Sequence, residues 1–126
     1  MQDPFAYLAD EKFVCLTTYR RNGTAVPTPM WFILGDGKMW MRTAENAGKA
    51  KRIRAGARVS VAPSDFRGRP TGRHLEAQAR LVPAAEVPFV DEGIKHKYGF
   101  MKKLVDLRTK LRGLKIVAIE ISPAVE

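Results

Sequence analysis

The sequence predicts a mainly β fold of the α+β class, in which six antiparallel strands form a closed barrel with helices packed outside. Three observations lead to this prediction. Short β-rich runs follow one another with turn residues between them, Asn22-Gly23 is a strong hairpin signal, and helical patterns are confined to a few segments. With 126 residues the chain has the length of one domain, which we expect to cover residues 1–126.

The first elements in chain order are a short helix and two strands. Residues 2–10 predict a leading helix, and residues 12–19 predict a strand that ends at the hairpin turn. Residues 24–34 predict the second strand, which contains Pro27 and Pro29. Because proline cannot donate a hydrogen bond to a ladder, this strand belongs at a sheet edge or a bulge.

The next segment predicts a strand that leads directly into a helix. Residues 38–43 alternate between two sets of side chains, Met39, Met41 and Thr43 on one side and Trp40 and Arg42 on the other. The two faces of this strand therefore meet different environments. The pattern becomes helical over residues 46–55, with Asn46 as the expected cap and Gly56 at the end.

Three further strands complete the barrel. Residues 57–62 and 73–82 predict the fourth and fifth strands, and the alternation of the fifth implies a solvated outer face. Residues 114–121 predict the sixth strand, which is apolar on both faces. Such a strand belongs in the middle of the structure or at a subunit contact.

A long helical segment separates the fifth and sixth strands. Apolar residues recur at helical spacing from Pro83 onward, and Gly113 ends the pattern. Gly93 and Gly99 are the candidate points at which this segment divides into two helices.

The charge balance indicates an anionic partner. The chain has 22 Lys and Arg against 13 Asp and Glu, a formal net charge of +9. The excess is concentrated in residues 42–58 and 95–115. Solvated helix faces explain any one such run, and nucleic acid, an anionic membrane surface and an anionic cofactor all remain open at this point.

Composition and motifs exclude several classes of protein. No apolar run approaches the length of a membrane span, and the N-terminus lacks the pattern of a secretory signal, so we expect a cytoplasmic protein.

The single cysteine, Cys15, lies in an apolar run and is expected to be buried and inert. His74 and His96 are expected at the surface, and their spacing predicts no metal site. No phosphate-binding loop or dinucleotide fingerprint is present, so an enzyme of this sequence would depend on a bound cofactor.

One segment has the character of a phosphate site. Residues 41–53 form the predicted strand end and helix start, where backbone N–H groups are unpaired and the helix dipole is positive. Gly48 lets a ligand approach the backbone, Lys49 adds a charge in the first turn, and Thr43 adds a hydroxyl. A capped basic helix without a ligand has the same pattern, and the residues alone do not separate the two interpretations.

The sequence resembles the pyridoxamine 5'-phosphate oxidase-like split β-barrel superfamily over nearly its whole length. The residues that carry this resemblance are Met41-Arg42-Thr43, 49–61, 16–19, Asn22-Gly23-Thr24, 26–32, Asp36-Gly37, 68–72 and Lys97-Tyr98-Gly99. They are most similar to the F420-dependent oxidoreductase branch, the flavin/deazaflavin oxidoreductases of B type. The resemblance implies a barrel of the FMN-binding split barrel type.

Two departures distinguish this chain from a pyridoxamine phosphate oxidase. The oxidases hold FMN with basic residues on the second strand, and residues 26–32 contain none. The oxidases also continue with a C-terminal segment, whereas this sequence has three residues after Pro123. Both departures favour F420 over FMN.

The resemblance also implies a set of cofactor-binding residues. Thr43 and Lys49 would hold the cofactor phosphate with support from Arg42 and Arg52. The deazaflavin ring would lie against Pro29, Met30 and Trp31, although plain core packing explains Met and Trp on a strand equally well. F420 carries a phosphodiester and a polyglutamate tail, which agrees with the basic excess.

By resemblance the expected function is an F420-dependent oxidoreductase, a reductase that transfers a hydride to a small planar electron-poor substrate. The expected assembly is a homodimer with the cofactor at the interface. The alternatives are an FMN-binding oxidoreductase of the same fold and a non-catalytic flavin or F420 binder, with nucleic-acid binding the weakest because the basic stretches are poor in aromatics. No side chain is assigned as catalytic. Tyr98 and solvent are the two candidate proton sources.

Overall fold

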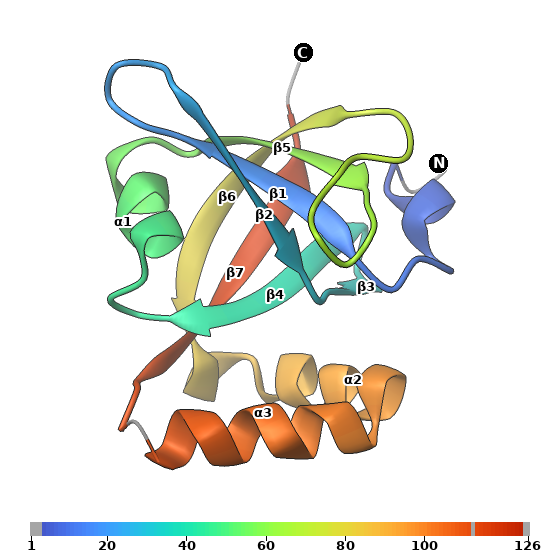
Figure 1. Cartoon of the computed structure of the whole chain (residues 1–126), viewed down its shortest axis with the longest axis vertical. Helices are drawn as coiled ribbons and strands as arrows, with labels where there is room; N and C mark the ends of the chain where they lie inside the picture. The colour runs from blue at the N-terminus through green and yellow to red at the C-terminus, as the bar shows by residue number, and fades with distance from the viewer. Residues whose placement is uncertain (1–3, 112, 125–126) are drawn as a thin grey trace.

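The computed structural model describes residues 4–111 and 113–124. Within them the strands form one antiparallel sheet in the order β2-β1-β5-β6-β7-β4-β3, which curls into a split barrel (Figure 1). The strands are β1 Val14–Tyr19, β2 Ala25–Met30, β3 Ile33–Gly35, β4 Lys38–Ala44, β5 Arg58–Pro63, β6 Leu75–Pro83 and β7 Ile116–Pro123. The helices are η1 Ala6–Leu8, α1 Gly48–Ala55, η2 Ala84–Glu86, α2 Pro88–Tyr98 and α3 Phe100–Leu111. The α+β split barrel with flanking helices is therefore confirmed, whereas the expected full closure was wrong, because β2 and β3 are the two edges of an open, curled sheet.

Alternating side chains of the strands fill the inside of the barrel. The core contains Val14, Leu16, Met39, Met41, Val59, Val61, Ala77, Ala79, Ile119 and Ile121. Phe5 and Leu8 from the η1 region and Ile53 from α1 pack against the same cluster. Both faces of β4 are used, because Trp40 points outward into a second cluster with Val90 and Ile94 of α2. The two environments predicted for this strand are confirmed.

The predicted second strand is divided, so the described chain has seven strands where the sequence predicted six. β2 pairs with β1 at one edge of the sheet, and β3 pairs with β4 at the other edge. The chain crosses between them at Phe32, whose ring is fully buried. The N–H of Phe32 donates to the Tyr98 hydroxyl at 3.1 Å, and its carbonyl accepts from Lys97 Nζ at 3.1 Å. The backbone of Phe32 therefore bonds to α2 and not to a neighbouring strand.

The turn and the edge position predicted for the first hairpin are confirmed. Gly23 has a φ of +89°, and its N–H donates to the carbonyl of Arg20 at 2.8 Å. β2, with Pro27 and Pro29, is an edge strand of the sheet.

The helix ends differ from the prediction in three places. The predicted helix 2–10 begins outside the described residues, and within them only the η1 turn forms. α1 begins at Gly48, its cap position is Ala47, and no side chain caps it, so the assignment of Asn46 as the cap was wrong. Of the two glycines predicted as division points after Pro83, Gly99 does divide the segment, with a φ of +56°, but Gly93 does not. Gly93 continues α2, and a Cβ atom there would lie 2.5 Å from Ile33 Cδ1, so a close approach to β3 explains this glycine.

The last strand lies in the middle of the sheet, between β6 and β4. Ile119 and Ile121 face the barrel core, while Ala118 and Glu120 are buried on the opposite face. Glu120 is paired with Lys38 at 3.1 Å and with Arg80 at 2.8 Å. The apolar character of this strand is thus satisfied within one chain and does not by itself indicate a subunit contact.

Candidate functional site

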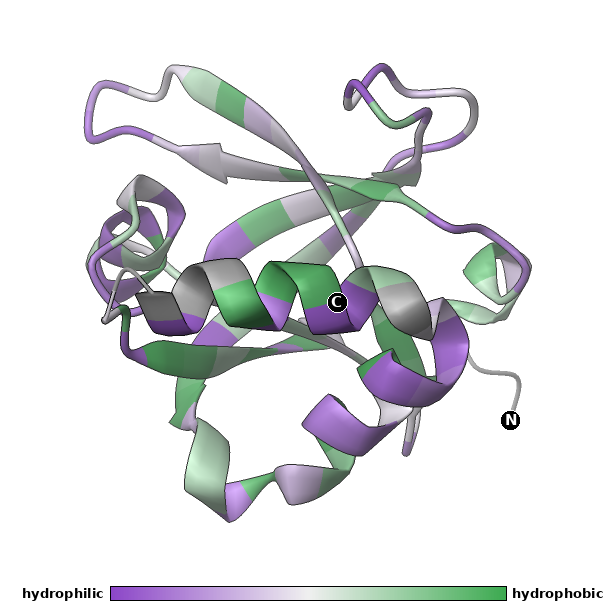
Figure 2. Ribbon diagram, turned by 60° about the horizontal axis from the view of Figure 1, so that its bottom comes forward, coloured by the Kyte–Doolittle hydropathy of each residue, from purple (hydrophilic) through white to green (hydrophobic). Residues whose placement is uncertain are grey.

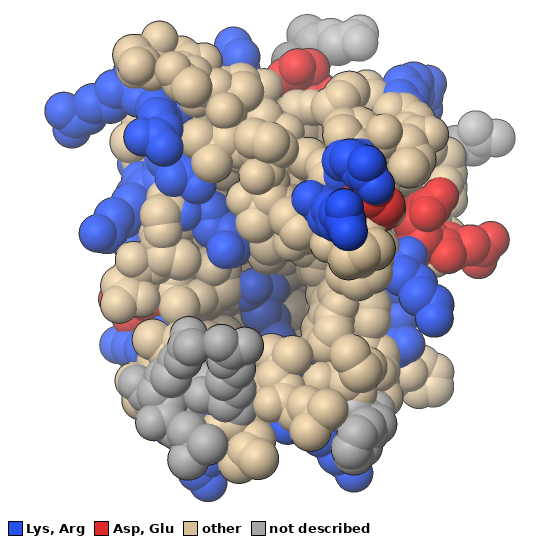
Figure 3. All heavy atoms as spheres, viewed as in Figure 1, with Lys and Arg blue, Asp and Glu red and all other residues tan. Residues whose placement is uncertain are grey.

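Two adjoining cavities lie between the barrel and the helical layer formed by α2 and α3. Figure 3 shows the surface hollowed above α3, with Lys and Arg atoms at the bottom of the hollow. The aromatic cavity, about 270 Å³, is lined by Phe13, Pro29, Met30, Trp31, Arg42, Ile94 and Val105. The basic cavity, about 260 Å³, is lined by Met30, Arg42, Thr43, Ala44, Lys49, Val105, Asp106, Leu114 and Ile116. Because the two share Met30, Arg42 and Val105, they form one continuous candidate site.

The structure brings together six of the seven residues singled out in the sequence. Pro29, Met30 and Trp31 line the aromatic cavity, Thr43 and Lys49 line the basic cavity, and Arg42 lines both. Arg52 lines neither cavity, and its Nε donates to Thr18 Oγ1 at 2.6 Å. Its guanidinium nevertheless lies over the start of α1, since a Cβ on Gly48 would be 2.9 Å from Arg52 Nη1.

Lys49 is a cation without a counter-ion in the described part of the chain. It lies half-buried in the first turn of α1, and no carboxylate pairs with it among the described residues. Burial, and then the neighbouring charge of Arg52, lower the pKa of the Lys49 ammonium. Both effects disfavour the charged form, and an anion bound here would relieve them.

Two kinds of neutral donor, backbone N–H groups and a hydroxyl, lie near Lys49. The first-turn N–H groups of α1 have no helical partner and no capping side chain. Thr43 is buried, and its hydroxyl makes no hydrogen bond within the described part of the chain. A half-buried ammonium, open helix N–H groups and a free hydroxyl are together the donor set that binds phosphate.

Arg42 is engaged in ion pairs that connect the barrel to both long helices. Its Nη1 donates to Asp91 of α2 at 2.6 Å, and its Nη2 donates to Asp106 of α3 at 2.9 Å. Lys102, only 5% exposed, binds the same two carboxylates. We refer to Arg42, Asp91, Lys102 and Asp106 as the ion cluster. Its two positive and two negative charges balance, so the wall between the cavities is close to neutral.

Tyr98 holds Trp31 in the wall of the aromatic cavity. The two rings are stacked, with centroids 4.5 Å apart and an interplanar angle of 9°. The Tyr98 hydroxyl donates to the carbonyl of Lys12 at 2.9 Å and accepts from the N–H of Phe32. Burial raises the pKa of Tyr98 to about 12 despite the hydrogen bond to Phe32. The hydroxyl is hydrogen-bonded to backbone groups, and the ring supports Trp31 in the wall of the aromatic cavity.

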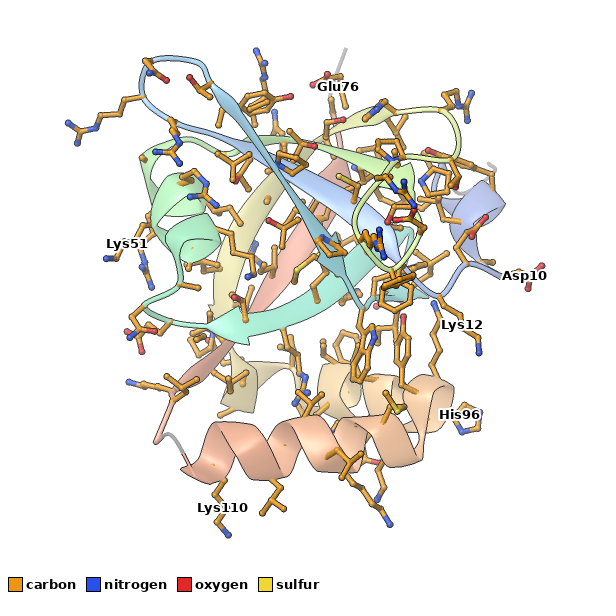
Figure 4. The ribbon with its side chains drawn as sticks, viewed as in Figure 1. Asp10, Lys12, Lys51, Glu76, His96 and Lys110 are labelled. Carbon is orange, nitrogen blue, oxygen red and sulfur yellow. The ribbon has the colours of Figure 1, made fainter. Side chains whose placement is uncertain are left out.

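A third cavity, of about 500 Å³, adjoins the basic cavity at Leu114. Its lining is Glu45, Asn46, Lys51, Arg54, Gly113, Leu114 and Lys115. Lys115 lies 3.6 Å from Glu45, whereas Lys51 and Arg54 have no carboxylate partner among the described residues. Figure 4 shows Lys51 extending from the outer side of α1. The positive charge around Lys49 therefore continues along the surface.

Sequence reasoning had not anticipated the ion cluster or Val105. Asp91, Lys102 and Asp106 belong to an amphipathic pattern in which charged residues are normally assigned to solvent. The one available signal was the i,i+4 spacing of Lys102 and Asp106, which is common on exposed helices. Their pairing with and around Arg42 depends on how α2 and α3 lie against β4.

Cys15 is buried as expected, with Sγ 3.7 Å from Thr17 Oγ1. His74 is exposed and lies 3.2 Å from the Ser60 hydroxyl, and His96 points away from the molecule in Figure 4. The described residues contain no cluster of three or more potential metal ligands. In residues 4–111 and 113–124, no helix is long and apolar enough to cross a membrane.

Comparison with known proteins matches the pyridoxamine 5'-phosphate oxidase family model to residues 5–121. A conserved hypothetical protein of Mycobacterium tuberculosis has a TM-score of 0.69 at 20% identity, covering 95% of this chain and 78% of its own. A protein named F420 reductase has a TM-score of 0.63 at 19% identity, with 99% and 97% covered. The heme storage protein HutZ of Vibrio cholerae has a TM-score of 0.71 at 13% identity, with 100% and 93% covered. At these identities the likeness concerns the fold alone. No curated protein matches the sequence.

The ion cluster generates a prediction about stability and pH. Burial opposes ionisation of Asp106, but hydrogen bonds from Lys102 and Arg42 outweigh it and hold the pKa of this carboxyl below its usual range. Asp106→Asn is expected to lower the free energy of unfolding at pH 7 by about 1 kcal/mol, less than for a fully buried pair because solvent screens Asp106. The contribution of a carboxylate with a lowered pKa is present above its unfolded pKa and is lost as the pH falls through its folded pKa. Urea unfolding at several pH values should therefore show the difference at pH 7 and its decline below about pH 4.

The matched control for this prediction is Glu92→Gln on α2. Glu92 is exposed and has no ion pair among the described residues, so its change should leave stability within about 0.5 kcal/mol at all pH values. An equal loss for the two variants would contradict a specific role of the ion cluster.

Proposed function

The chain belongs to the pyridoxamine 5'-phosphate oxidase family, and from this membership we propose that it is an F420-dependent oxidoreductase. When bound, the reduced deazaflavin supplies a hydride, which we propose is transferred to a small planar electron-poor substrate. The proposal depends mainly on one observation, the unpaired Lys49 ammonium at the open start of α1 beside Arg52. The residues of the site fit the group, because a phosphate there would meet a cation, helix N–H groups and the Thr43 hydroxyl.

The third cavity favours F420 over FMN. FMN ends at its phosphate, whereas F420 continues from a phosphodiester into a chain of carboxylates. Lys51 and Arg54 lie in the cavity next to the one that contains Lys49, and neither has a carboxylate partner in the described structure. Unpaired cations beyond the phosphate position support a ligand whose negative charge continues.

The composition of β2 also favours F420 over FMN. β2 reads AVPTPM and contains no Lys or Arg, so it offers none of the basic side chains by which the FMN-dependent oxidases hold their cofactor. Arg42, which lines the aromatic cavity, is already paired with two carboxylates. The FMN-binding oxidoreductase and the non-catalytic flavin or F420 binder remain the alternatives to our proposal.

The side chains of the aromatic cavity would orient the reactants and exclude water. Trp31 is fixed by its stack on Tyr98, and Met30 and Pro29 continue the same wall. A flat ring fits such a wall by dispersion and burial. Positioning of two reactants supplies a large part of the rate enhancement when the cofactor supplies the reactive group.

Titration with F420, FMN and haem tests the proposed cofactor. We expect F420 to bind at least tenfold more tightly than FMN, about 1.4 kcal/mol, because only F420 engages the basic residues beyond the phosphate. Fluorescence quenching of each flavin and the Soret band of haem give the three affinities. Equal or tighter binding of FMN would mean that the FMN alternative is correct.

Lys49→Ala tests the phosphate position. The change removes a charge-assisted hydrogen bond worth about 1.5–3 kcal/mol, so F420 affinity should fall about tenfold or more. Stability should change little, because alanine suits the first turn of a helix and one of two neighbouring positive charges is removed.

Lys95→Ala is the matched control for Lys49→Ala. Lys95 is exposed on α2 and lines none of the cavities described, so its removal should cost F420 affinity much less. If both variants lose affinity equally, and the loss disappears at high salt, the diffuse positive field and not a defined phosphate site binds the cofactor.

We also propose that the protein is a homodimer with the cofactor near the interface. A large open cavity, about 660 Å³, lies outside the barrel between β1, β5 and the loop of residues 64–72. This loop approaches the aromatic cavity, since a Cβ on Gly68 would lie 2.9 Å from Pro29 Cδ. A second copy seated on this face would bring its own residues close to the wall that contains Pro29.

Light scattering at micromolar concentration checks the assembly and should give twice the mass of one chain. Pro70→Glu, which places a charge in the cavity beside the loop, should shift the protein toward the monomer and weaken F420. A monomeric wild type with full F420 affinity would contradict the dimer but leave the cofactor proposal intact.

A further inference from the structure

α3 exposes its apolar side chains to solvent. Met101, Leu104, Val105 and Leu107 are 57%, 50%, 42% and 57% exposed. We call these four residues the apolar stripe. Figure 2 shows the corresponding hydrophobic bands along α3 on the outside of the molecule. Isolated exposed apolar residues are common, but a continuous row along one helix marks an interaction surface.

The orientation of the apolar stripe is fixed by the ion cluster. Lys102 and Asp106 lie on the inner side of α3, where they pair with Asp91 and Arg42. Turning α3 so that the stripe faced the barrel would break these ion pairs and expose a buried lysine. The helix therefore directs Lys102 and Asp106 toward the barrel and presents its apolar side outward.

The surroundings of the apolar stripe are basic. Lys103 and Lys110 of α3 and Lys95 of α2 are exposed and have no carboxylate partner among the described residues. Figure 4 shows Lys110 pointing away from the barrel. Asp106 is the acidic residue of α3, and it is held on the inner side. The outer side of α3 thus combines apolar side chains with unpaired positive charge.

From this combination we propose that α3 binds the surface of an anionic lipid bilayer. An amphipathic helix lies in the plane of the interface when its apolar side enters the acyl boundary and its lysines meet anionic headgroups. The 12 residues of α3 extend about 18 Å, enough to lie on a bilayer and too short to cross one. This proposal is independent of the cofactor proposed above.

Charge complementarity favours a lipid surface over a second copy of the chain at this position. Two copies facing each other through the apolar stripe would bring their unpaired lysines together, and like charges at an interface are unfavourable. An anionic bilayer neutralises these lysines and accepts the apolar side chains at once.

Cosedimentation of the full chain with vesicles tests the proposal. We expect binding to vesicles of phosphatidylcholine and phosphatidylglycerol in equal parts and little binding to phosphatidylcholine alone. The double variant Leu104→Gln with Leu107→Gln should reduce the bound fraction at fixed lipid at least tenfold. Both side chains are half exposed or more, so the variant should fold normally, which circular dichroism and the thermal midpoint check.

Phe66→Gln is the matched control, because Phe66 is 65% exposed on the loop outside β1 and far from α3 in sequence. It should bind vesicles as the wild type does. Three results would overturn the proposal: no binding of the wild type to anionic vesicles, equal binding by the double variant, or a wild-type dimer that the double variant dissociates. The last result would show that a second copy covers the apolar stripe. The experiment measures lipid binding and not cofactor binding, so its failure can be distinguished from a failure of the F420 proposal.

Discussion

The ion pairs between Arg42 of β4 and the carboxylates of the two long helices set the arrangement of the whole site. Asp91 comes from α2 and Asp106 from α3, so one arginine connects the barrel to both helices. Lys102 is buried beside them, and removal of either carboxylate would leave a cation poorly compensated. The helical layer is thus held where it encloses the cavities against the barrel.

The same cluster decides which charges are available to a ligand. Arg42 is neutralised by its two partners, whereas Lys49 has none in the described structure. An anion therefore gains most at the start of α1, and the aromatic cavity next to it stays close to neutral. The site therefore offers a phosphate position at the start of α1 and, next to it, a position for an uncharged ring in the aromatic cavity.

The cluster also determines what α3 presents outside. By holding Lys102 and Asp106 inward it leaves the apolar stripe in solvent, and Val105 belongs both to that stripe and to the wall of the two cavities. The candidate site and the candidate docking surface therefore share an edge. A change that loosens the ion cluster is expected to affect both.

From the sequence alone one could predict five of the strands, the hairpin at Gly23, the edge position of β2 and the strand-to-helix segment that contains Lys49, because these follow from local turn chemistry and side-chain period. The family resemblance also located Thr43 and the residues 29–31 that line the cavities. Three features depend on the tertiary fold: Phe32 leaves the strand, Arg42 is paired, and α3 turns Lys102 and Asp106 inward. Those outcomes depend on contacts between residues distant in the chain, such as Phe32 with Tyr98 and Arg42 with Asp106. A pattern of hydrophobic and charged residues gives the two faces of a helix, but the partner that each face meets is set by where the helix crosses the barrel.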